Sequence, residues 1–592
     1  MKPGSNKLTK KVSGHFFGLG SVVLLVLAGY SNTYSVPFLF DDNASLASVE
    51  HLYQGSLNDL FRHFGSARAV GYASFKLNYE LDGFNVLGFH VANTLIHILA
   101  GVTVYLLAFS LFKALDPAND KGRRSDPNSL RFDTAQWFAV TAALLFVLHP
   151  IQTQAVTYIV QRLASLVALW YLLALCCYVG ARTVSTWLIK VFFLLAVLVF
   201  GFLAIYTKQN SFTLPFAILL VEIVFFRRWR LPLWAVPLAT VAIIWVVWAI
   251  LEFLPQFPHL DRVLSETQDF SRLQYFETQL GILPMYLKLY LLPVGQQVEI
   301  IYPLKDGSFA GSWYWVVLHI SLLAAALYSV GRYPWFAFGL LFFYLAHSVE
   351  SGFVPISDLA FEHRMYLPSF GLALMATSLI VKLRVTYARA CSLVLIALLL
   401  VLTYQRNGLW AEPIKLMQSE IDANFDKPRI HAFLGDLYRD EGEYSKAAQS
   451  YENAFNLVGL GGELDNQGYE QRYAYLNNYV ANLGRSGQYR KAIDVSSSFL
   501  DEIRNSEHLW ALTNNLGYLH YELKDYNQCI MHMMNAVGID PKRHESFVGA
   551  GLCFYYLGRE DESLMMFTNG LALAPNPEEV RGIMVTLSLL DP

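Results

Sequence analysis

Long apolar runs, separated by short polar connections, fill the first 404 residues. A helix needs about 20 residues to cross the roughly 30 Å of hydrocarbon in a bilayer. Counting runs of this length, together with slightly shorter runs closed by polar ends, predicts eleven membrane spans. They lie near residues 12–32, 90–112, 134–149, 157–180, 185–206, 211–226, 231–253, 313–331, 333–350, 368–383 and 388–404.

Basic residues between the spans predict how the chain is oriented in the membrane. Five basic connections fall on the side of the N-terminal lysines when eleven spans are counted, and Lys and Arg mark the cytoplasmic side of short loops. These connections are 113–131, Arg182, 227–230, Arg332 and 382–389. If the apolar segment 279–294 also crossed the membrane, Arg332 and the connection 382–389 would lie on the opposite side. Because Pro284 and Pro293 interrupt it, we expect a re-entrant or interfacial segment.

The connection between the first two spans begins with two adjacent carboxylates, Asp41 and Asp42. Charged groups in a low-dielectric setting cost solvation energy, which makes such a pair a functional candidate. The alternative is a solvated helix exit closed by an Asx-type cap. Two amphipathic stretches follow, 45–53 and 57–64, and we expect short helices lying along the membrane face.

The last third of the chain has a different pattern, with a period near 34 residues. Gly517 and Gly551 are 34 apart, as are Pro541 and Pro575. This period is typical of tetratricopeptide repeats, which pair two helices per unit. The spacing predicts four units from residue 428 onward, with 456–472 as an insertion between the first two. Such solenoids have a concave groove for peptides or partner proteins.

Composition agrees with a membrane protein that carries a soluble domain. The chain is 54% hydrophobic with a mean hydropathy of +0.35, which exceeds what soluble globular proteins show. Residues 1–404 hold 28 basic and 21 acidic residues, whereas 405–592 hold 16 and 26. The fold class expected is therefore all-α: a helical membrane bundle at 1–404, then an extracytoplasmic repeat domain at 405–592.

The cysteines and the N-terminus give two further expectations. Five cysteines form no framework, and Cys529 and Cys553 lie in predicted helices without metal-ligand partners, so we expect neither a disulfide nor a zinc site. Lysines precede the first apolar run, as in a signal peptide. No small-residue cleavage site follows, so an uncleaved first span is expected.

Several short motifs together resemble one known family. They are Asp41 and Asp42; the segments 74–79, 83–85 and 89–93; His149 and Pro150; Arg162; Lys208 with 213–215; 286–289 with 293–295; and the stretch Glu362 to Ser369. Their order, with the repeats, resembles the membrane O-mannosyltransferase-like proteins with tetratricopeptide repeats, of the GT-C class of polyprenyl-phosphate-sugar-dependent glycosyltransferases. In contrast to the family pattern, the chain has Ala69 after Arg68, Ala164 or Ser165 in place of an acid, and Gln209 after Lys208.

The resemblance implies roles for individual residues. Asp41 would be the base that takes the proton of the acceptor hydroxyl, with Asp42 orienting it or the acceptor. Arg364 and His363, next to Glu362, would hold the donor phosphate, with Lys208 and Arg162 as further candidates. The alternatives are snorkelling at helix ends for Arg162 and Lys208, and an interfacial salt-bridge cluster for 362–364. His149, Arg68 and Tyr366 would line the site.

Cofactor and partner expectations follow from the same motifs. Asp41, Asp42 and Glu362 are oxygen ligands suited to Mg or Mn, but members of the class differ in metal dependence and no metal is assigned. The partners implied are a polyprenyl-phosphate-linked sugar donor, membrane lipid and a protein acceptor held by the repeat groove. No nucleotide-binding motif is present, and no nucleic acid is expected.

The function expected is therefore transfer of a sugar from a polyprenyl-linked donor to a protein hydroxyl on the extracytoplasmic face. One alternative is a transferase that acts on a glycolipid or surface polysaccharide. Another is a non-enzymatic, membrane-anchored repeat scaffold for envelope or pilus assembly. Four repeats without a retention signal favour a bacterial inner membrane with the repeats in the periplasm; the alternative is the endoplasmic reticulum with the repeats in the lumen.

The distribution of basic loops makes a direct prediction about topology. A reporter that fluoresces only in the cytoplasm, fused after Asp591, should stay dark because the repeat domain is expected outside. The same reporter placed in the basic loop at Arg332 should be bright. Fluorescence from the C-terminal fusion would restore a crossing at 279–294 and place Glu362 on the cytoplasmic side.

Overall fold

The computed structural model describes residues 5–115, 132–227 and 266–589, apart from 268 and 459–465. Several predicted features lie outside the described residues. They are the span 231–253, the parts 116–131 and 228–230 of two basic connections, and the centre of the predicted insertion. The described residues contain helices and connecting segments but no strand, so the all-α prediction is confirmed. Two compact units are present, 1–412 and 413–592.

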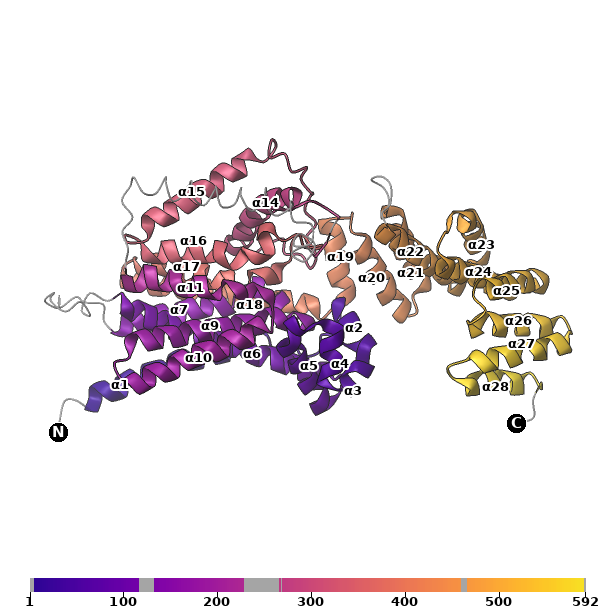
Figure 1. The fold of residues 1–592 in the computed structure, drawn as a ribbon, viewed down its shortest axis with the longest axis horizontal. Coiled ribbons are helices and arrows are strands. Elements are labelled where there is room, and N and C mark those ends of the chain that lie inside the picture. The colour runs from indigo at the N-terminus through magenta and orange to yellow at the C-terminus, as the bar shows by residue number, and fades with distance from the viewer. Residues whose placement is uncertain (1–4, 116–131, 228–265, 268, 459–465, 590–592) are drawn as a thin grey trace. The chain divides into compact units, whose positions relative to one another are not determined.

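The first unit is a bundle of apolar helices. Figure 1 shows most of them lying side by side. The helices are α1 (Ser5–Gly29), α6 (Val86–Ala114), α7 (Phe132–Val147), α9 (Arg162–Thr183), α10 (Trp187–Ile205), α11 (Leu214–Val221), α14 (Arg272–Leu291), α15 (Trp313–Ser329), α16 (Pro334–His347), α17 (Pro368–Val381) and α18 (Val385–Trp410).

Five helices of the described residues are long and apolar enough to cross a membrane, or six if the bent pair formed by α7 and residues 150–156 is one span. Four shorter apolar helices accompany them. Every predicted span within the described residues coincides with one of these helices, although the total of eleven stays a prediction. Helix α14 is not among the candidates, and its placement at the interface also stays a prediction.

Burial separates the helices at the centre of the bundle from those on its outside. In the most apolar stretch of α9, 67% is buried inside the protein, whereas 11% of the corresponding stretch of α10 is buried. Large side chains of α10, such as Trp187, Leu188 and Phe192, are exposed. An outward apolar face is stable only in a nonpolar solvent, so α10 is suited to contact lipid along its length.

Four short helices between α1 and α6 gather at one end of the bundle (Figure 1). They are α2 (Asp41–Ser45), α3 (Glu50–Gln54), α4 (Leu57–Phe64) and α5 (Ala69–Asp82). The start of α4 is specified by a capping box, in which Ser56 accepts from the N–H of Asp59 and the Asp59 side chain accepts from the N–H of Ser56. The amphipathic stretches 45–53 and 57–64 thus correspond to η1 (Ala47–Val49) with α3, and to α4.

The second unit contains four antiparallel helix pairs between the flanking helices α19 (Pro413–Ala423) and α28 (Pro577–Thr586). The pairs are α20 (Pro428–Asp440) with α21 (Tyr444–Leu457), α22 (Asn466–Arg485) with α23 (Tyr489–Phe499), α24 (Ser506–Glu522) with α25 (Tyr526–Ile539), and α26 (His544–Tyr556) with α27 (Glu560–Leu573). They match the four predicted repeats. Helix α22 begins at Asn466, so the end of the predicted insertion, 466–472, is helical.

The turn within each pair requires a left-handed backbone conformation. Gly442, Gly487 and Gly558 occupy this position with φ of 80°, 79° and 74°. In the third pair the residue is Lys524, with φ of 61°. Glycine adopts positive φ without a steric penalty, so Lys524 is the exception among the four turns.

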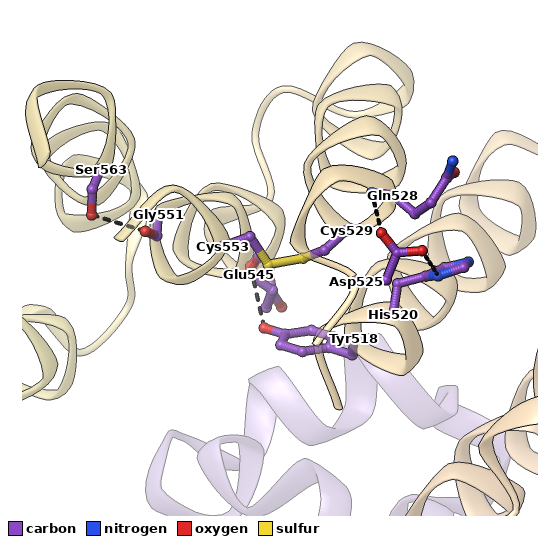
Figure 2. The surroundings of a disulfide bond; sticks show 9 residues. All are labelled: Tyr518, His520, Asp525, Gln528, Cys529, Glu545, Gly551, Cys553 and Ser563. Atoms are coloured by element: carbon purple, nitrogen blue, oxygen red, sulfur yellow. Dashed lines mark hydrogen bonds and ion pairs between the residues drawn. A yellow bond between two sulfur atoms is a disulfide. The ribbon is translucent and has the colours of Figure 1, made fainter. Parts of the chain in front are cut away.

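The prediction that no disulfide forms was wrong. Cys529 on α25 and Cys553 on α26 are bonded, and their Cα atoms are 6.3 Å apart, within the usual range for a disulfide (Figure 2). Both cysteines are fully buried. The pairing was missed because the two residues are 24 apart in sequence and approach only when the third and fourth repeats stack.

Helices α16 and α17 cross at two glycines. A Cβ atom added to Gly339 would lie 2.7 Å from the carbonyl oxygen of Gly371 and 2.8 Å from the Cβ of Met375. Neither of these atoms belongs to the end of a flexible side chain, so the helices would have to move apart. Small residues allow this kind of close backbone approach in membrane bundles.

We therefore expect Gly339→Ala to destabilise the protein by about 1–3 kcal/mol, as overpacking commonly does. Gly20→Ala is the matched control, because nothing lies within 4 Å of a Cβ built at Gly20. Melting temperatures of the two variants in detergent should differ, with only the Gly339 variant falling below wild type. Equal melting temperatures would contradict the tight crossing.

Candidate active site

The acid pair begins α2, directly after a strained residue. Phe40 has φ of 48°, a conformation that bulky residues rarely adopt and that tends to occur at functional sites. Its ring lies edge-on to Tyr158, with the ring centroids 6.2 Å apart. At the start of a helix, carboxylates are favoured by the backbone dipoles. The turn at Phe40 therefore places Asp41 and Asp42 in the first turn of α2.

Asp42 is fully enclosed by backbone groups. Its Oδ1 accepts from the N–H of Val160 at 2.7 Å, and its Oδ2 accepts from the N–H of Leu39 at 3.1 Å. Burial raises the pKa of Asp42 to about 8, although both hydrogen bonds oppose this rise. Asp42 thereby connects the segment between α1 and α6 to the segment before α9.

Asp41 is more accessible than Asp42. Its backbone N–H donates to the hydroxyl of Tyr158 at 2.8 Å. Tyr158 in turn packs against Trp410 at the end of α18, with the ring centroids 5.6 Å apart. The two acids thus differ in environment: Asp42 is fixed on both oxygens, whereas Asp41 is fixed through its backbone.

The residues 149–162, which we call the central turn, contact each part of the candidate site. They comprise η4 (Pro150–Gln152), α8 (Thr153–Val156) and η5 (Ile159–Gln161), with His149 and Arg162 at the two ends. Gln154 accepts from the N–H of His363 at 2.8 Å and donates to the carbonyl of Val298 at 2.7 Å. Thr157 donates to Asn407 at 2.6 Å. The central turn therefore joins the loop of the acid pair to the loop containing 362–364 and to α18.

Arg162 is fully buried and donates only to neutral groups. Its Nε contacts Asn93 Oδ1 at 2.6 Å, its Nη1 contacts the carbonyl of Ser74 at 3.0 Å, and its Nη2 contacts the carbonyl of Phe89 at 3.1 Å. The guanidinium also lies over the ring of Phe75, 4.5 Å from its centroid. Arg162 thus connects α5 and α6 to α9, and its guanidinium is buried inside the protein.

Arg364 makes a similar set of contacts in the loop 354–367. It donates to the carbonyl oxygens of Asp358 at 2.6 Å, Leu359 at 3.0 Å and Glu350 at 3.3 Å. Its neighbour His363 is buried, and burial lowers the pKa of His363 well below its ordinary value, so the ring is neutral at pH 7. The two residues form part of η10 (Glu362–Met365).

Glu362 and Lys208 each have a partner that the sequence did not indicate. Glu362 accepts from the N–H of Gln297 at 2.5 Å, and the Nη2 of Arg406 lies 4.0 Å from the same carboxylate. Lys208 pairs with Glu350 at 2.5 Å. An acid at the end of a predicted span, such as Glu350, is a signal that could have identified this pair.

The three predicted lining residues occupy separate environments. The ring of His149 stacks on Tyr290, and its Nε2 is 2.8 Å from the carbonyl oxygen of that residue. The hydroxyl of Tyr366 is 2.7 Å from Nδ1 of His97, inside the bundle. Arg68 ends η2 (Ser66–Arg68), directly before α5. Only His149 belongs to the central turn.

The candidate metal ligands do not gather around a common point. Within the part of the chain that the structure describes, no group of three or more His, Cys, Asp and Glu side chains could hold a metal ion. Asp42 already accepts two backbone N–H groups and Glu362 accepts one. The set formed by Asp41, Asp42 and Glu362 is therefore not arranged as a metal centre.

Comparisons with known proteins point to one group of relatives. A tetratricopeptide repeat model matches residues 428–457 and 513–543. The chain is 25% identical over 478 residues to "Protein O-mannosyl-transferase F38B6.6" of Caenorhabditis elegans, which covers 76% of this chain and 64% of the relative. It is 30% identical to human TMTC4 over 33% of this chain and 27% of the relative, and 30% identical to human TMTC2 over 26% and 18%.

These alignments are partial with respect to the relatives. The chain spans less than two thirds of the worm protein and about a quarter or less of the two human proteins. Solved structures of tetratricopeptide repeat proteins are also similar. YrrB, described as having an unusual peptide-binding site, gives a TM-score of 0.23 at 13% identity, covering 29% of this chain and 80% of that protein. A thermophilic repeat protein of Thermus thermophilus gives 0.24 at 18%, covering 31% and 90%.

The environment of Asp42 predicts a change of stability with pH. Because the pKa is raised by folding, Asp42 stabilises the fold below about pH 4, and this contribution is lost as the pH rises toward about 8. Asn resembles the protonated acid and does not titrate. Melting curves in detergent should therefore show Asp42→Asn gaining stability relative to wild type between about pH 4 and 8, by about 1.4 kcal/mol per pKa unit at most.

Asp59→Asn serves as the control for this measurement. The capping hydrogen bonds to Ser56 lower the pKa of Asp59 below its ordinary value, so above about pH 5 it is ionised in both the folded and the unfolded state. The difference between Asp59→Asn and wild type should stay constant from about pH 5 to 8. A constant difference for Asp42→Asn as well would show that Asp42 is ionised in the fold.

Proposed function

The chain resembles the protein O-mannosyl-transferases with tetratricopeptide repeats, and on this premise we propose that it is a membrane glycosyltransferase. It moves a sugar from a polyprenyl-phosphate-linked donor to a hydroxyl of a protein on the extracytoplasmic face. The observation that supports this most is the acid pair, in which Asp42 is buried and fixed while its neighbour Asp41 is more accessible.

The proposed reaction assigns different tasks to the two acids. The carboxylate of Asp41 takes the proton from the acceptor hydroxyl while that oxygen forms a bond to the anomeric carbon of the sugar. The bond between this carbon and the phosphate oxygen breaks, and the electron pair leaves with the polyprenyl phosphate. Asp42 positions Asp41, because its two hydrogen bonds to Leu39 and Val160 fix the start of α2.

The donor phosphate is proposed to bind beside the loop of 362–364. The phosphate side of the proposed site is formed by Glu362, His363 and Arg364, with Lys208 and Arg162 as further candidates. Arg364 acts by holding the loop through three carbonyl oxygens. His363 is neutral, and its Nδ1 lies 3.2 Å from Oε1 of Gln154, so it helps to fix this loop to the central turn. His149, of the central turn, is proposed to lie nearest the sugar, while Arg68 and Tyr366, which occupy other environments, stay further candidates.

The disulfide supports an extracytoplasmic position for the repeat domain, 405–592. Disulfides persist in oxidising compartments and are rare in the cytosol. The bond between Cys529 and Cys553 therefore fits the periplasm next to a bacterial inner membrane, or alternatively the lumen of the endoplasmic reticulum. In both cases the repeats are on the same side as Asp41 and Asp42 in the predicted topology, with the transferase domain, 1–404, in the membrane.

The acceptor is proposed to bind in the repeat domain. A cavity of about 520 Å³ lies between α22, α23 and α24. Its lining includes aromatic side chains and groups that donate and accept hydrogen bonds: Arg485, Tyr489, Asn515, Tyr518 and Glu522. These groups are suited to an extended peptide, whose backbone needs both donors and acceptors. Holding the acceptor would raise the effective concentration of its hydroxyl at the site.

Purified full-length protein, supplied with polyprenyl-phosphate mannose and a peptide containing Ser and Thr, tests the proposal. Asp41→Asn should lower transfer by about a hundred- to ten-thousand-fold, the usual contribution of a general base. Asn keeps the shape of the side chain but cannot take a proton. Asp42→Asn should be milder, and Asp59→Asn, on the exposed face of α4, should have no effect.

Three other outcomes would contradict parts of this proposal. Normal transfer by Asp41→Asn would remove the acid pair from the centre of the mechanism. Transfer to a glycolipid but not to the peptide would favour the alternative acceptor. Wild-type protein that neither transfers the sugar nor hydrolyses the donor would favour a scaffold.

A further inference from the structure

Arg406 lies near the end of α18, and two of its nitrogen donors have no hydrogen-bond acceptor among the described residues. Its side chain is 9% exposed, yet Nε and Nη2 have no hydrogen-bond acceptor there. Its carboxylate neighbour, Glu362, is 4.0 Å from Nη2, which is too far for a hydrogen bond. Burying a guanidinium without acceptors is strongly unfavourable. Such an arrangement persists where a ligand can complete it.

The other cations considered for this region have protein partners. Arg162 donates to Asn93 and to two carbonyl oxygens, Arg364 donates to three carbonyl oxygens, and Lys208 pairs with Glu350. An anion that bound to one of them would have to displace these contacts. Arg406 can bind an anion without losing a hydrogen bond at Nε or Nη2.

The position of Arg406 connects it to both halves of the candidate site. The next residue, Asn407, accepts from Thr157 of the central turn. One turn further, Trp410 packs on Tyr158, whose hydroxyl receives the N–H of Asp41. On its other side, Arg406 approaches Glu362. The side chain therefore lies between the segment that positions the acid pair and the segment proposed to hold the donor.

A second buried donor without an acceptor belongs to Gln296, next to the residue that bonds Glu362. Glu362 accepts from the N–H of Gln297, and the side-chain Nε2 of the preceding residue, Gln296, is buried without an acceptor among the described residues. Buried N–H groups are almost always paired, so the unpaired donors on Arg406 indicate a site suited to an anion, and Gln296, next to a residue that bonds Glu362, is a further candidate donor.

The two free nitrogens of Arg406 also define the shape of the ligand. Nε–H and Nη2–H lie on one edge of the planar guanidinium and point in nearly the same direction. This edge forms two parallel hydrogen bonds to two oxygens of a carboxylate or phosphate. Because Glu362 is held by the N–H of Gln297, it does not close onto this edge.

We propose that Arg406, assisted by Gln296, binds the phosphate of the polyprenyl-linked donor. This inference rests on the proposed function and names a phosphate-binding residue for it. Two nonbridging oxygens of the phosphate accept from Nε and Nη2. As the bond from the anomeric carbon to the phosphate oxygen breaks, the electron pair moves onto the phosphate, and the fixed positive charge stabilises the extra negative charge.

Binding of polyprenyl phosphate to the full chain in detergent tests this directly. Thermal shifts should show that polyprenyl phosphate stabilises wild type, whereas polyprenol without phosphate does not. Arg406→Gln should weaken the binding of polyprenyl phosphate by about 10- to 100-fold, as expected for lost hydrogen bonds to a charged group. Arg406→Lys should retain only part of the affinity, because a point charge cannot form two parallel hydrogen bonds.

Arg389→Gln is the matched control, since Arg389 is an exposed cation at the other end of the same helix. It should bind polyprenyl phosphate like wild type. Inorganic phosphate separates a general anion site from a lipid-phosphate site. It should bind more weakly than polyprenyl phosphate, and equal affinities would overturn the assignment to the donor.

The competing role for Arg406 is a structural ion pair with Glu362. In that case Arg406→Gln would lower the melting temperature of the free protein but leave the affinity for polyprenyl phosphate unchanged, which would overturn the inference. If Arg406→Gln fails to fold, Arg406→Lys gives the same comparison. Sugar transfer that persists with unchanged affinity in the Arg406 variants would refute this inference alone. Phosphate binding that depends on Arg406, without any sugar transfer, would refute only the proposed function.

Discussion

In a membrane interior, every backbone N–H and C=O needs a partner within the protein, and the central turn depends on this constraint more than any other segment described. The helix α7 ends at Val147, and Pro150, which has no N–H, begins a short helical stretch bent by 51° from it. A break of this kind is tolerated only where other protein groups bond to the freed backbone. Asn93 on α6 donates to the carbonyl oxygens of Val156 and Ile159. Thr403 on α18 donates to the carbonyl oxygen of Leu148, and Asp42 accepts from the N–H of Val160.

The same constraint explains how buried charges are distributed. Arg162 and Arg364 donate mainly to carbonyl oxygens, while Asp42 and Glu362 accept from backbone N–H groups. These four groups are thus bonded mainly to the backbone, whereas Lys208 and Glu350 pair with each other. A buried acid that is not neutralised by a neighbouring cation can still exchange its proton, and for Asp42 burial brings the pKa to about 8. The arrangement is compatible with acid and base chemistry at a membrane surface.

The sequence predicted the features that follow from local rules. Apolar length identified the membrane helices, and the 34-residue period identified four repeats. The structure adds local signals of the same kind, since the capping box at Ser56 and the glycines at 442, 487 and 558 mark helix ends. These signals depend on neighbours within one or two helical turns, so they can be read without knowledge of the fold.

Contacts between distant segments could not be predicted in this way. The disulfide between Cys529 and Cys553 depends on how two repeats stack, and the sequence led to the opposite expectation. The pairs of Asp42 with Val160 and of Lys208 with Glu350 join segments more than a hundred residues apart. Arg406 was missed because its significance lies in bonds that it does not make, and such an absence is visible only when all neighbours are in place.

The disulfide also affects the mechanics of the second unit. A repeat solenoid bends and twists by small rotations at each interface between successive units, so its overall curvature varies. The covalent bond joins α25 of the third repeat to α26 of the fourth and removes most of that freedom at one interface. The C-terminal end of the solenoid is therefore a stiff segment, and its elastic deformation is concentrated in the interfaces among the first three repeats.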